Sequence, residues 1–321
     1  MSKAKLFVTR KLPDPVEARI TREFDATLQS DGPVLSAETI IAGAKGCDAL
    51  LVAPGDPITP AVIEALKESV KVISTFSVGF DHIDLQAARN AGIPVGHTPD
   101  VLSDATADLT WLLLLAAARR AFEGEKMVRD DAWTGWTPTQ LMGTQVSGKR
   151  IAILGMGRIG QGVAKRARGF DMEVHYHNRS RLAADKEQGA VYHDTPESLF
   201  AVADFLCLLC PLTPATKGLV NAKTIELLPK GAIIVNTGRG PVVDDEALIE
   251  ALKSGRVAAA GLDVYAGEPK IHVGYRDLSN VFLLPHLGSA THETRLAMGN
   301  LAIDNIQAVL NGGRPVCEIS A

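Results

Sequence analysis

A glycine-rich turn is the clearest chemical feature of the sequence. Gly155, Gly157 and Gly160 form the pattern GxGxxG within GMGRIG, between the apolar run RIAIL and the helical pattern QGVAKRARGF. In such a turn the first glycine permits a tight bend, the second lets the backbone approach a pyrophosphate, and the third lets helix and strand pack closely. The helix N-terminus then offers amide donors to the phosphates. A βα turn without a ligand is the alternative, but the strand and helix context favours a dinucleotide site.

The end of the next strand indicates which dinucleotide would bind. Proteins that bind NAD usually carry Asp or Glu there, about 20 residues after the glycines, to hold the ribose 2'-hydroxyl. Here the strand EVHYHN ends at Asn178 and is followed by Arg179, Ser180 and Arg181, without a carboxylate, and Glu173 stands at the wrong end of the strand. Two guanidinium groups suit a 2'-phosphate, which arginine can bind bidentately. The sequence therefore predicts NADPH as the cofactor, with a solvated basic loop as the alternative.

Two series of short apolar runs must position these residues. The first series is KLFVTR, DALLVAP, KVISTFSVG and IPVGHTP; the second is RIAILG, EVHYHN, DFLCLLC, GAIIVNTG, VAAAGLDV and VFLLPH. Helix-length segments separate the runs, a pattern that predicts βαβ units on parallel sheets. A long helix is expected from about Ser103 to about Met127, capped by Ser103 or Asp104. A last helix is expected from about Thr291 to Leu310, ending at Asn311-Gly312-Gly313 and packing on the N-terminal domain.

Composition and charge exclude several other classes of protein. The 321 residues are 46% hydrophobic and 22% charged, as is typical of a globular protein. With 33 Lys+Arg, 37 Asp+Glu and a net charge of -4, there is no general basic field for nucleic acid or an anionic membrane. The longest apolar run, Trp111 to Ala118, is far shorter than the roughly 20 residues of a spanning helix. Four irregularly spaced cysteines and an N-terminus without a secretory pattern predict a reducing, cytoplasmic location.

Four segments together resemble one known family. GMGRIG, NTGRGPVVDDEAL, GLDVYAGEP and LLPHLGSAT occur in the order and approximate spacing of the D-2-hydroxyacid dehydrogenases, and the resemblance covers the whole chain. Within that family, WTGWTP and HNRSR are most similar to the glyoxylate/hydroxypyruvate reductases. The resemblance implies an enzyme that transfers a hydride from NADPH to a small 2-keto acid, giving the D-2-hydroxy acid. It also implies a homodimer, while the net charge and the short apolar runs predict no nucleic acid or membrane partner.

The expected fold is α/β, with two doubly wound parallel-sheet, Rossmann-like domains and the active site in the cleft between them. Residues 1–99 and 290–321 would form the substrate-binding domain, and residues 100–289 the dinucleotide-binding domain. Ligands of open α/β sheets bind beyond the carboxyl ends of the strands. Closure of the cleft would exclude water during hydride transfer.

Three residues are the candidates for catalysis. Reduction of a 2-keto acid needs a cation for the carboxylate, a proton donor for the carbonyl oxygen and a positioned hydride. Arg239, Glu268 and His286 each come just after an apolar run. The resemblance implies that Arg239 binds the substrate carboxylate and carbonyl, that His286 donates the proton, and that Glu268 hydrogen-bonds His286 and favours its charged form. Taken singly, each could be an ordinary surface, turn or core residue.

The resemblance implies further contacts for substrate and cofactor. Val78 and Gly79, in SVGFDHID, would offer backbone amides to the substrate carboxylate, and Trp136 would reach the partner subunit's substrate cleft. The stretch 131–145 and the long helix would form the subunit interface. Besides the glycines and residues 178–181, the expected cofactor contacts are Thr106, Arg158, Ile159, Cys210, Pro211, Thr237, Asp263 and His286.

Two motifs are set aside, and other functions stay open. Cys207 and Cys210 match C-x-x-C but lie in an apolar strand pattern, so we interpret them as core residues. His175 and His177 alternate on a strand without a completing ligand pattern, so no metal is expected. A hydroxyphenylpyruvate-type reductase and a dinucleotide-sensing co-repressor of the same fold are the alternatives. Phosphoglycerate dehydrogenase is a weaker one, and so is formate dehydrogenase, which has Gln where Glu268 stands.

Overall fold

The computed structural model describes residues 3–319, which fall into two compact units. One unit comprises residues up to Leu102 together with those from Ser289 onward, and the other is Ser103–Gly288. These junctions lie close to the domain boundaries expected at 99/100 and 289/290. The chain therefore leaves the first unit, builds the whole second unit, and returns.

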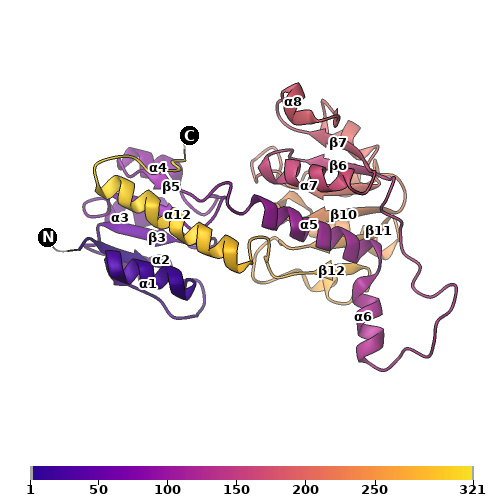
Figure 1. The fold of residues 1–321 in the computed structure, drawn as a ribbon, viewed down its shortest axis with the longest axis horizontal. Helices are drawn as coiled ribbons and strands as arrows, with labels where there is room; N and C mark the ends of the chain where they lie inside the picture. Colours follow the sequence, from indigo (N-terminus) through magenta and orange to yellow (C-terminus); the bar gives the residue numbers. More distant parts are fainter. Residues whose placement is uncertain (1–2, 320–321) are drawn as a thin grey trace. The chain divides into compact units, whose positions relative to one another are not determined.

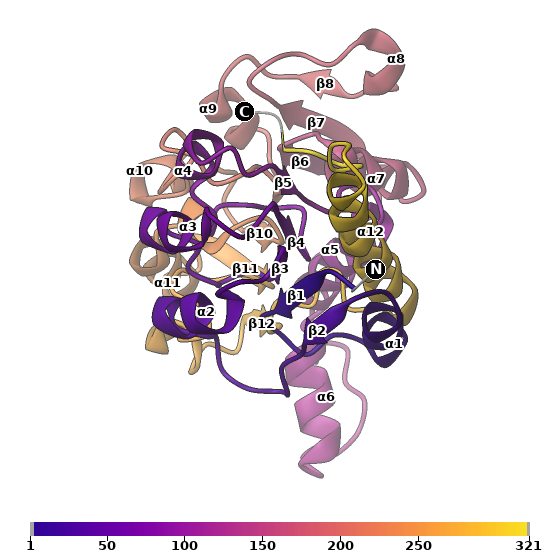
Figure 2. The ribbon, with the colours of Figure 1, turned by 90° about the vertical axis from the view of Figure 1, so that its left-hand side faces the viewer.

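The first unit contains a five-stranded parallel sheet in the order β2-β1-β3-β4-β5. Figure 2 shows that helices cover both faces of this sheet and that the last helix of the chain lies on one of them. The strands are β1 (Lys5–Val8), β2 (Asp25–Thr27), β3 (Ala49–Val52), β4 (Val72–Thr75) and β5 (Val95–Gly96). The helices are α2 (Ala37–Ala44), α3 (Pro60–Leu66) and α4 (Leu85–Asn90) on one face, and α1 (Asp14–Glu23) and α12 (His292–Leu310) on the other.

Local sequence explains these elements. The side chains of Ser36, Thr59, Asp84 and Thr291 each accept a hydrogen bond from an amide in the first turn of the helix that follows them. Such N-caps satisfy amide donors that the helix itself leaves free. Every residue of β3 and β4 is buried, as expected for central parallel strands covered on both faces.

The second unit contains a seven-stranded parallel sheet in the order β12-β11-β10-β9-β6-β7-β8. The strands are β6 (Arg150–Leu154), β7 (Glu173–His177), β8 (Val191–Tyr192), β9 (Phe205–Leu208), β10 (Ala232–Asn236), β11 (Val257–Leu262) and β12 (Val281–Leu283). The strand order reverses beside β6, and the glycine-rich turn follows β6 directly. Ligands of doubly wound sheets bind at such a reversal.

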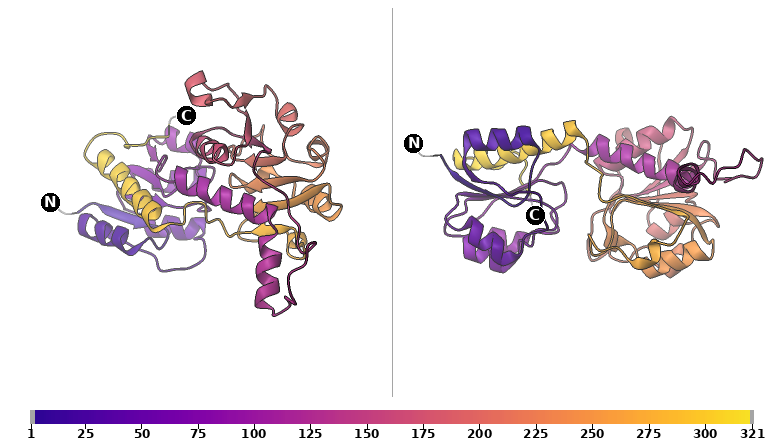
Figure 3. Two further views of the ribbon diagram at one scale, coloured as in Figure 1. Left: turned by 45° about the vertical axis from the view of Figure 1, so that its right-hand side comes forward. Right: turned by 90° about the horizontal axis from the view of Figure 1, so that it is seen from below.

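Helices cover both faces of the second sheet, as the right panel of Figure 3 shows. On one face lie α5 (Ser103–Ala118) and α7 (Arg158–Arg168); α9 (Pro196–Phe200), α10 (Ala222–Ile225) and α11 (Asp245–Lys253) pack into the core on the other. The remaining short elements are α8 (Ala184–Glu187) and the 3-10 turns η1 (Gly240–Val242) and η2 (Val273–Tyr275). The prediction of two parallel α/β sheets of the Rossmann type is therefore confirmed.

The expected long helix from Ser103 to Met127 is wrong, because two helices occupy its place. α5 ends at Ala118, and α6 (Ala121–Arg129) starts after Arg120, which has a left-handed backbone with φ of 53°. Arg120 binds Glu123 through two hydrogen bonds of 2.8 and 2.7 Å, and this pair stabilises the start of α6. Figure 1 shows α6 projecting from its unit, followed by the long connection to β6. Ser103 is the first residue of α5, so neither Ser103 nor Asp104 precedes the helix as a cap.

Candidate active site

The three candidate catalytic residues follow three neighbouring strands of the second unit. Arg239 follows β10, Glu268 follows β11 and His286 follows β12, so all three lie beyond the carboxyl edge of the sheet. The Nδ1 atom of His286 is 2.7 Å from Oε2 of Glu268. The other oxygen of Glu268 accepts a hydrogen bond of 2.9 Å from the amide of Tyr265. Glu268 is thus held on both oxygens and orients the imidazole.

The charge of Glu268 follows from its surroundings. Burial by itself raises the pKa of this carboxyl, but hydrogen bonds from His286 and Tyr265 and the charges of His286 and Arg239 outweigh burial, so the pKa lies below its ordinary value. A carboxylate can only accept, so His286 carries a proton on Nδ1. Nε2 is therefore the atom that can exchange a proton with a substrate. The His286 side chain is 42% exposed, so a substrate can approach it.

Asp263 holds the turn that carries His286. Its carboxylate accepts hydrogen bonds from the amides of Leu287 (2.6 Å) and Gly288 (2.9 Å), and its carbonyl accepts the His286 amide at 2.9 Å. His286 has a left-handed backbone, with φ of 56°, so these contacts fix an uncommon conformation. Asp263 is expected among the cofactor contacts; its side chain is buried, and its carboxylate accepts both of these hydrogen bonds from the turn of His286. Burial raises the pKa of its carboxyl.

A buried asparagine that sequence reasoning missed shapes the loop of Arg239. The side chain of Asn236 accepts from the Gly238 amide at 3.0 Å and donates to the Arg239 carbonyl at 3.1 Å. The next residue, Gly240, allows a very close approach, since a Cβ there would lie 1.8 Å from the carbonyl carbon of Tyr265. The loops after β10 and β11 are therefore packed together around Arg239, and no larger residue fits at position 240.

The glycine-rich turn has the geometry that a pyrophosphate requires. Gly155 has a φ of 103°, and a Cβ on it would lie 2.5 Å from the amide nitrogen of Cys210. A Cβ on Gly160 would lie 2.4 Å from the carbonyl oxygen of Gly155. Gly157, by contrast, has no described atom within 4 Å of its Cβ position, and it precedes α7 without a side-chain cap. Open space in front of an uncapped helix N-terminus fits an anionic group.

Other residues that are expected to contact the cofactor lie near the carboxyl edge of the second sheet. Arg158 and Ile159 form the first turn of α7, and Cys210-Pro211 comes after β9 beside Gly155. The buried hydroxyl of Thr237 lies 2.8 Å from that of Thr110, whose hydroxyl also donates to the carbonyl of Thr106. All of these residues belong to the second unit.

The expected cofactor residues in the loop after β7 differ in their surroundings. Asn178 turns inward, and its side chain accepts the amide of Met156 at 2.6 Å, so it ties the glycine-rich turn to the end of β7. Arg179 and Ser180 are exposed. Arg181 is already paired with Glu187, a carboxylate that sequence reasoning missed because it lies beyond the strand end on α8.

Val78 and Gly79 belong to the first unit and follow its strand β4. The hydroxyl of Ser77 donates to the Gly79 carbonyl at 2.6 Å, and Nδ1 of His97 donates to the Val78 carbonyl at 3.0 Å. Because the C=O and N–H of a trans peptide point in opposite directions, the His97 contact also fixes the direction of the Gly79 amide. Trp136 lies in the connection between α6 and β6, and its side chain is 78% exposed.

Of the residues that sequence reasoning set aside, Cys207, Cys210 and His175 are buried, and His177 is half-buried. Burial raises the pKa of the Cys207 thiol to about 12 and that of Cys210 to about 11, so neither forms a thiolate readily. His175 is buried, and its Nδ1 lies 2.9 Å from Nε2 of His193. Between residues 3 and 319, no group of three or more His, Cys, Asp or Glu side chains is placed to hold a metal ion. Over the same residues, no helix is both long and apolar enough to cross a membrane.

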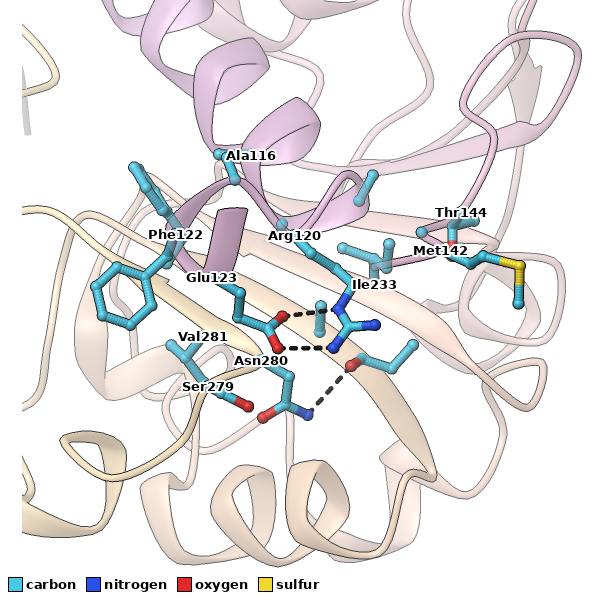
Figure 4. A pocket seen from close by; sticks show the side chains of 17 residues that line it. Ala116, Arg120, Phe122, Glu123, Met142, Thr144, Ile233, Ser279, Asn280 and Val281 are labelled. Carbon is cyan, nitrogen blue, oxygen red and sulfur yellow. Dashed lines mark hydrogen bonds and ion pairs between the residues drawn. The ribbon is translucent and has the colours of Figure 1, made fainter. Parts of the chain in front are cut away.

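A pocket of about 320 Å³ lies at the opposite edge of the second sheet (Figure 4). Its walls come from the end of α5, the start of α6, residues 142–144 and the amino ends of β10, β11 and β12. The ion pair of Arg120 and Glu123 lies among the side chains that line the pocket, as Figure 4 shows. Arg239, Glu268 and His286 lie at the other ends of these strands, so this pocket is separate from the catalytic edge.

Comparison with known proteins identifies the family. Residues 111–288 match the model of the D-isomer specific 2-hydroxyacid dehydrogenase, NAD binding domain. The glycerate dehydrogenase of Hyphomicrobium methylovorum is 45% identical over 314 residues, covering 97% of this chain and 98% of the relative. The glyoxylate reductase of Thermococcus litoralis is 41% identical over 318 residues, covering 98% and 96%. The chain belongs to the D-isomer specific 2-hydroxyacid dehydrogenase family and is an enzyme of that family.

A solved structure agrees with this assignment. The NADPH-dependent glyoxylate/hydroxypyruvate reductase of Sinorhizobium meliloti, in complex with NADP and malonate, superposes with a TM-score of 0.90 at 31% identity. The match covers 99% of this chain and 97% of that one. The family prediction made from the four motifs is therefore confirmed.

Proposed function

We propose that this enzyme reduces small 2-keto acids of the glyoxylate/hydroxypyruvate type with NADPH, giving D-2-hydroxy acids. The observation that carries the proposal is the 2.7 Å contact between His286 and Glu268, beyond the same sheet edge as Arg239 and the glycine-rich turn. A proton donor, a cation and a dinucleotide turn are the parts that this reduction needs.

The roles follow from the chemistry of each group. Arg239 binds the substrate carboxylate and the carbonyl oxygen with its planar fork of donors. His286 gives the proton on Nε2 to the carbonyl oxygen, which becomes the hydroxyl, while Glu268 stabilises the charged ring. When bound, the cofactor supplies the hydride that forms the new C–H bond at the carbonyl carbon. Val78 and Gly79 offer further donors to the carboxylate, from the first unit, and Trp136 bounds the substrate cleft of the partner subunit in a homodimer.

The loop after β7 and the comparisons support NADPH and the small substrate. Residues 178–181 carry two arginines and no carboxylate, and a relative of known structure is NADPH-dependent. The glycerate dehydrogenase relative points to the same chemistry, because oxidation of glycerate at its second carbon gives hydroxypyruvate. A bulkier substrate such as hydroxyphenylpyruvate is the second candidate, and a keto-acid panel separates the two.

The test is a steady-state assay with glyoxylate, hydroxypyruvate and hydroxyphenylpyruvate, each with NADPH and with NADH. We expect the small keto acids to be preferred, and NADPH to exceed NADH by at least about tenfold in kcat/KM, the effect of one charge-assisted contact. His286→Asn should lower kcat on the order of 10²-fold with little change in cofactor binding. Equal use of NADH, or near-normal turnover by this variant, would contradict the proposal.

A further inference from the structure

The two arginines after β7 have different surroundings. Arg181 contacts Glu187 twice, through Nε to Oε1 at 2.8 Å and through Nη2 to Oε2 at 3.1 Å. Its guanidinium also lies 5.8 Å from the ring centroid of Tyr192. Arg179 is exposed and has no hydrogen bond or ion pair with another residue of the described part of the chain. Of these two arginines, therefore, only Arg179 has every N–H group of its guanidinium available to a ligand.

Glu187 is fixed from the other side by a buried tyrosine. The hydroxyl of Tyr176 donates to Oε1 of Glu187 at 2.5 Å and accepts the amide of Leu182 at 3.0 Å. Tyr176 is fully buried, and the Glu187 side chain is only 10% exposed. Hydrogen bonds from Arg181 and Tyr176 lower the pKa of the Glu187 carboxyl in spite of burial, so it is ionised at neutral pH.

This pair limits what Arg181 can do for a ligand. Arginine binds a phosphate most strongly with two parallel N–H groups on one edge of the guanidinium. On Arg181 the Nε edge is occupied by Glu187. Release of that edge would leave a nearly buried carboxylate without its cation, which is costly. The same carboxylate also repels a phosphate that approaches the loop.

We infer that Glu187 is a specificity-determining residue for the cofactor: it withholds Arg181 and leaves Arg179 as the main ligand for a 2'-phosphate. The inference rests on the proposed function in one respect, that the adenosine end of the dinucleotide meets the loop after β7. It follows that the preference for NADPH over NADH is smaller than two free arginines would give, and that it is limited by a residue outside the loop.

Binding of two adenosine fragments tests this without turnover. Isothermal titration calorimetry gives the Kd of the full chain for adenosine 2',5'-bisphosphate and for 5'-AMP, which lacks the 2'-phosphate. Glu187→Gln keeps an acceptor for Tyr176 and removes the charge. It should raise the affinity for the bisphosphate relative to AMP by about tenfold, the effect of one charge-assisted hydrogen bond. The ratio of kcat/KM for NADPH and NADH should rise in parallel.

A matched control separates this effect from net charge. Glu226 pairs with Arg256 at 3.2 Å on the same unit, near the amino end of β11, so Glu226→Gln removes one carboxylate away from the loop. The control should leave the ratio of affinities unchanged. An unchanged or lower ratio in Glu187→Gln, or an equal rise in both variants, would overturn the inference.

Two arginine variants decide the question even if Glu187→Gln does not fold. Arg179→Met should lower the affinity ratio about tenfold, the effect of one charge-assisted contact. Arg181→Met should lower it by less, and that smaller loss includes the repulsion from Glu187, which this variant leaves without its cation. Equal losses in the two variants would overturn the inference but leave the proposed function in place. Failure of the wild-type chain to bind either fragment would overturn the dinucleotide site itself, and the inference with it.

Discussion

At the scale of single residues, the catalytic edge is organised by carboxylates that act on neighbours. Glu268 orients His286, Asp263 fixes the turn on which His286 stands, and Glu187 holds Arg181. The pKa values of Glu268 and Glu187 lie below their ordinary value because each accepts hydrogen bonds from a basic side chain. In the proposed function, these three similar groups therefore serve proton transfer, backbone geometry and ligand choice.

Glu268→Gln tests the first of these roles through the pH profile. Because the pKa of Glu268 is lowered, the wild-type carboxylate is ionised throughout the neutral range and stabilises the protonated ring of His286. Glutamine removes that charge and keeps the size. Reduction of the keto acid requires the protonated ring, so its rate should begin to fall at a lower pH than in the wild type.

The reverse reaction provides the control for this variant. Oxidation of the hydroxy acid requires the neutral ring, so its rate should begin to rise at a lower pH in Glu268→Gln. Both profiles are read from kcat/KM over pH 5 to 10, with circular dichroism to show that the fold persists. Profiles that keep their wild-type positions in both directions would contradict the role of Glu268.

At the scale of elements, the sequence predicts best where a pattern is long. All six expected strands of the second unit and all four of the first are present, because runs of buried apolar residues identify central parallel strands. β2 (DAT) and β8 (VY) were missed because neither belongs to a longer apolar run, whereas the equally short β5 lies within the run IPVGHTP. The break at Arg120 was missed because the helical pattern continues on both sides of it.

The candidate site shows the same limit. The glycines and the residues after β10, β11 and β12 could be predicted, since each stands at the end of a recognisable strand. The role of Glu187 could not be predicted, because its pairing with Arg181 depends on how α8 folds back beside β7. The roles of Asn236 and Asn178 could not be predicted either, since their side chains bind backbone groups whose position only the folded loops define.

The connection between α6 and β6 carries a prediction about substrate choice. Trp136 is 78% exposed, whereas Trp133 donates its indole N–H to the carbonyl of Gly135 at 2.9 Å. If Trp136 bounds the partner subunit's cleft, Trp136→Ala should change the relative kcat/KM of small and bulky keto acids. Trp133→Ala is the matched control and should leave that order intact. A uniform loss for all substrates, or a monomer by light scattering, would contradict the role of Trp136.

At the scale of the whole molecule, the second unit is an insertion into the first. Asn305 of α12 is fully buried; it donates to the carbonyl of His97 at 2.9 Å and accepts the amide of Cys317 at 2.8 Å. Gly96 makes room for it, since a Cβ there would lie 2.7 Å from Cγ of Asn305. The last helix is therefore part of the core of the first unit.

This architecture predicts how fragments behave. Residues 103–288 contain a complete sheet with helices on both faces, so we expect this fragment to unfold cooperatively on heating. Residues 1–102 lack α12, which covers β4, so they should not show a cooperative transition alone. Circular dichroism melts of both fragments check this. Cooperative melting of residues 1–102 without residues 289–321 would contradict the prediction.

The position of α12 also has a consequence for biosynthesis. The ribosome makes β1 to β5 first, but Asn305 and the rest of α12 emerge only after the whole of Ser103–Gly288 has been translated. During that interval the nascent sheet exposes the apolar face that α12 will cover. The inserted unit, Ser103–Gly288, can therefore finish folding before the first unit does. The N-terminal sheet is the part of the nascent chain that a chaperone would need to protect.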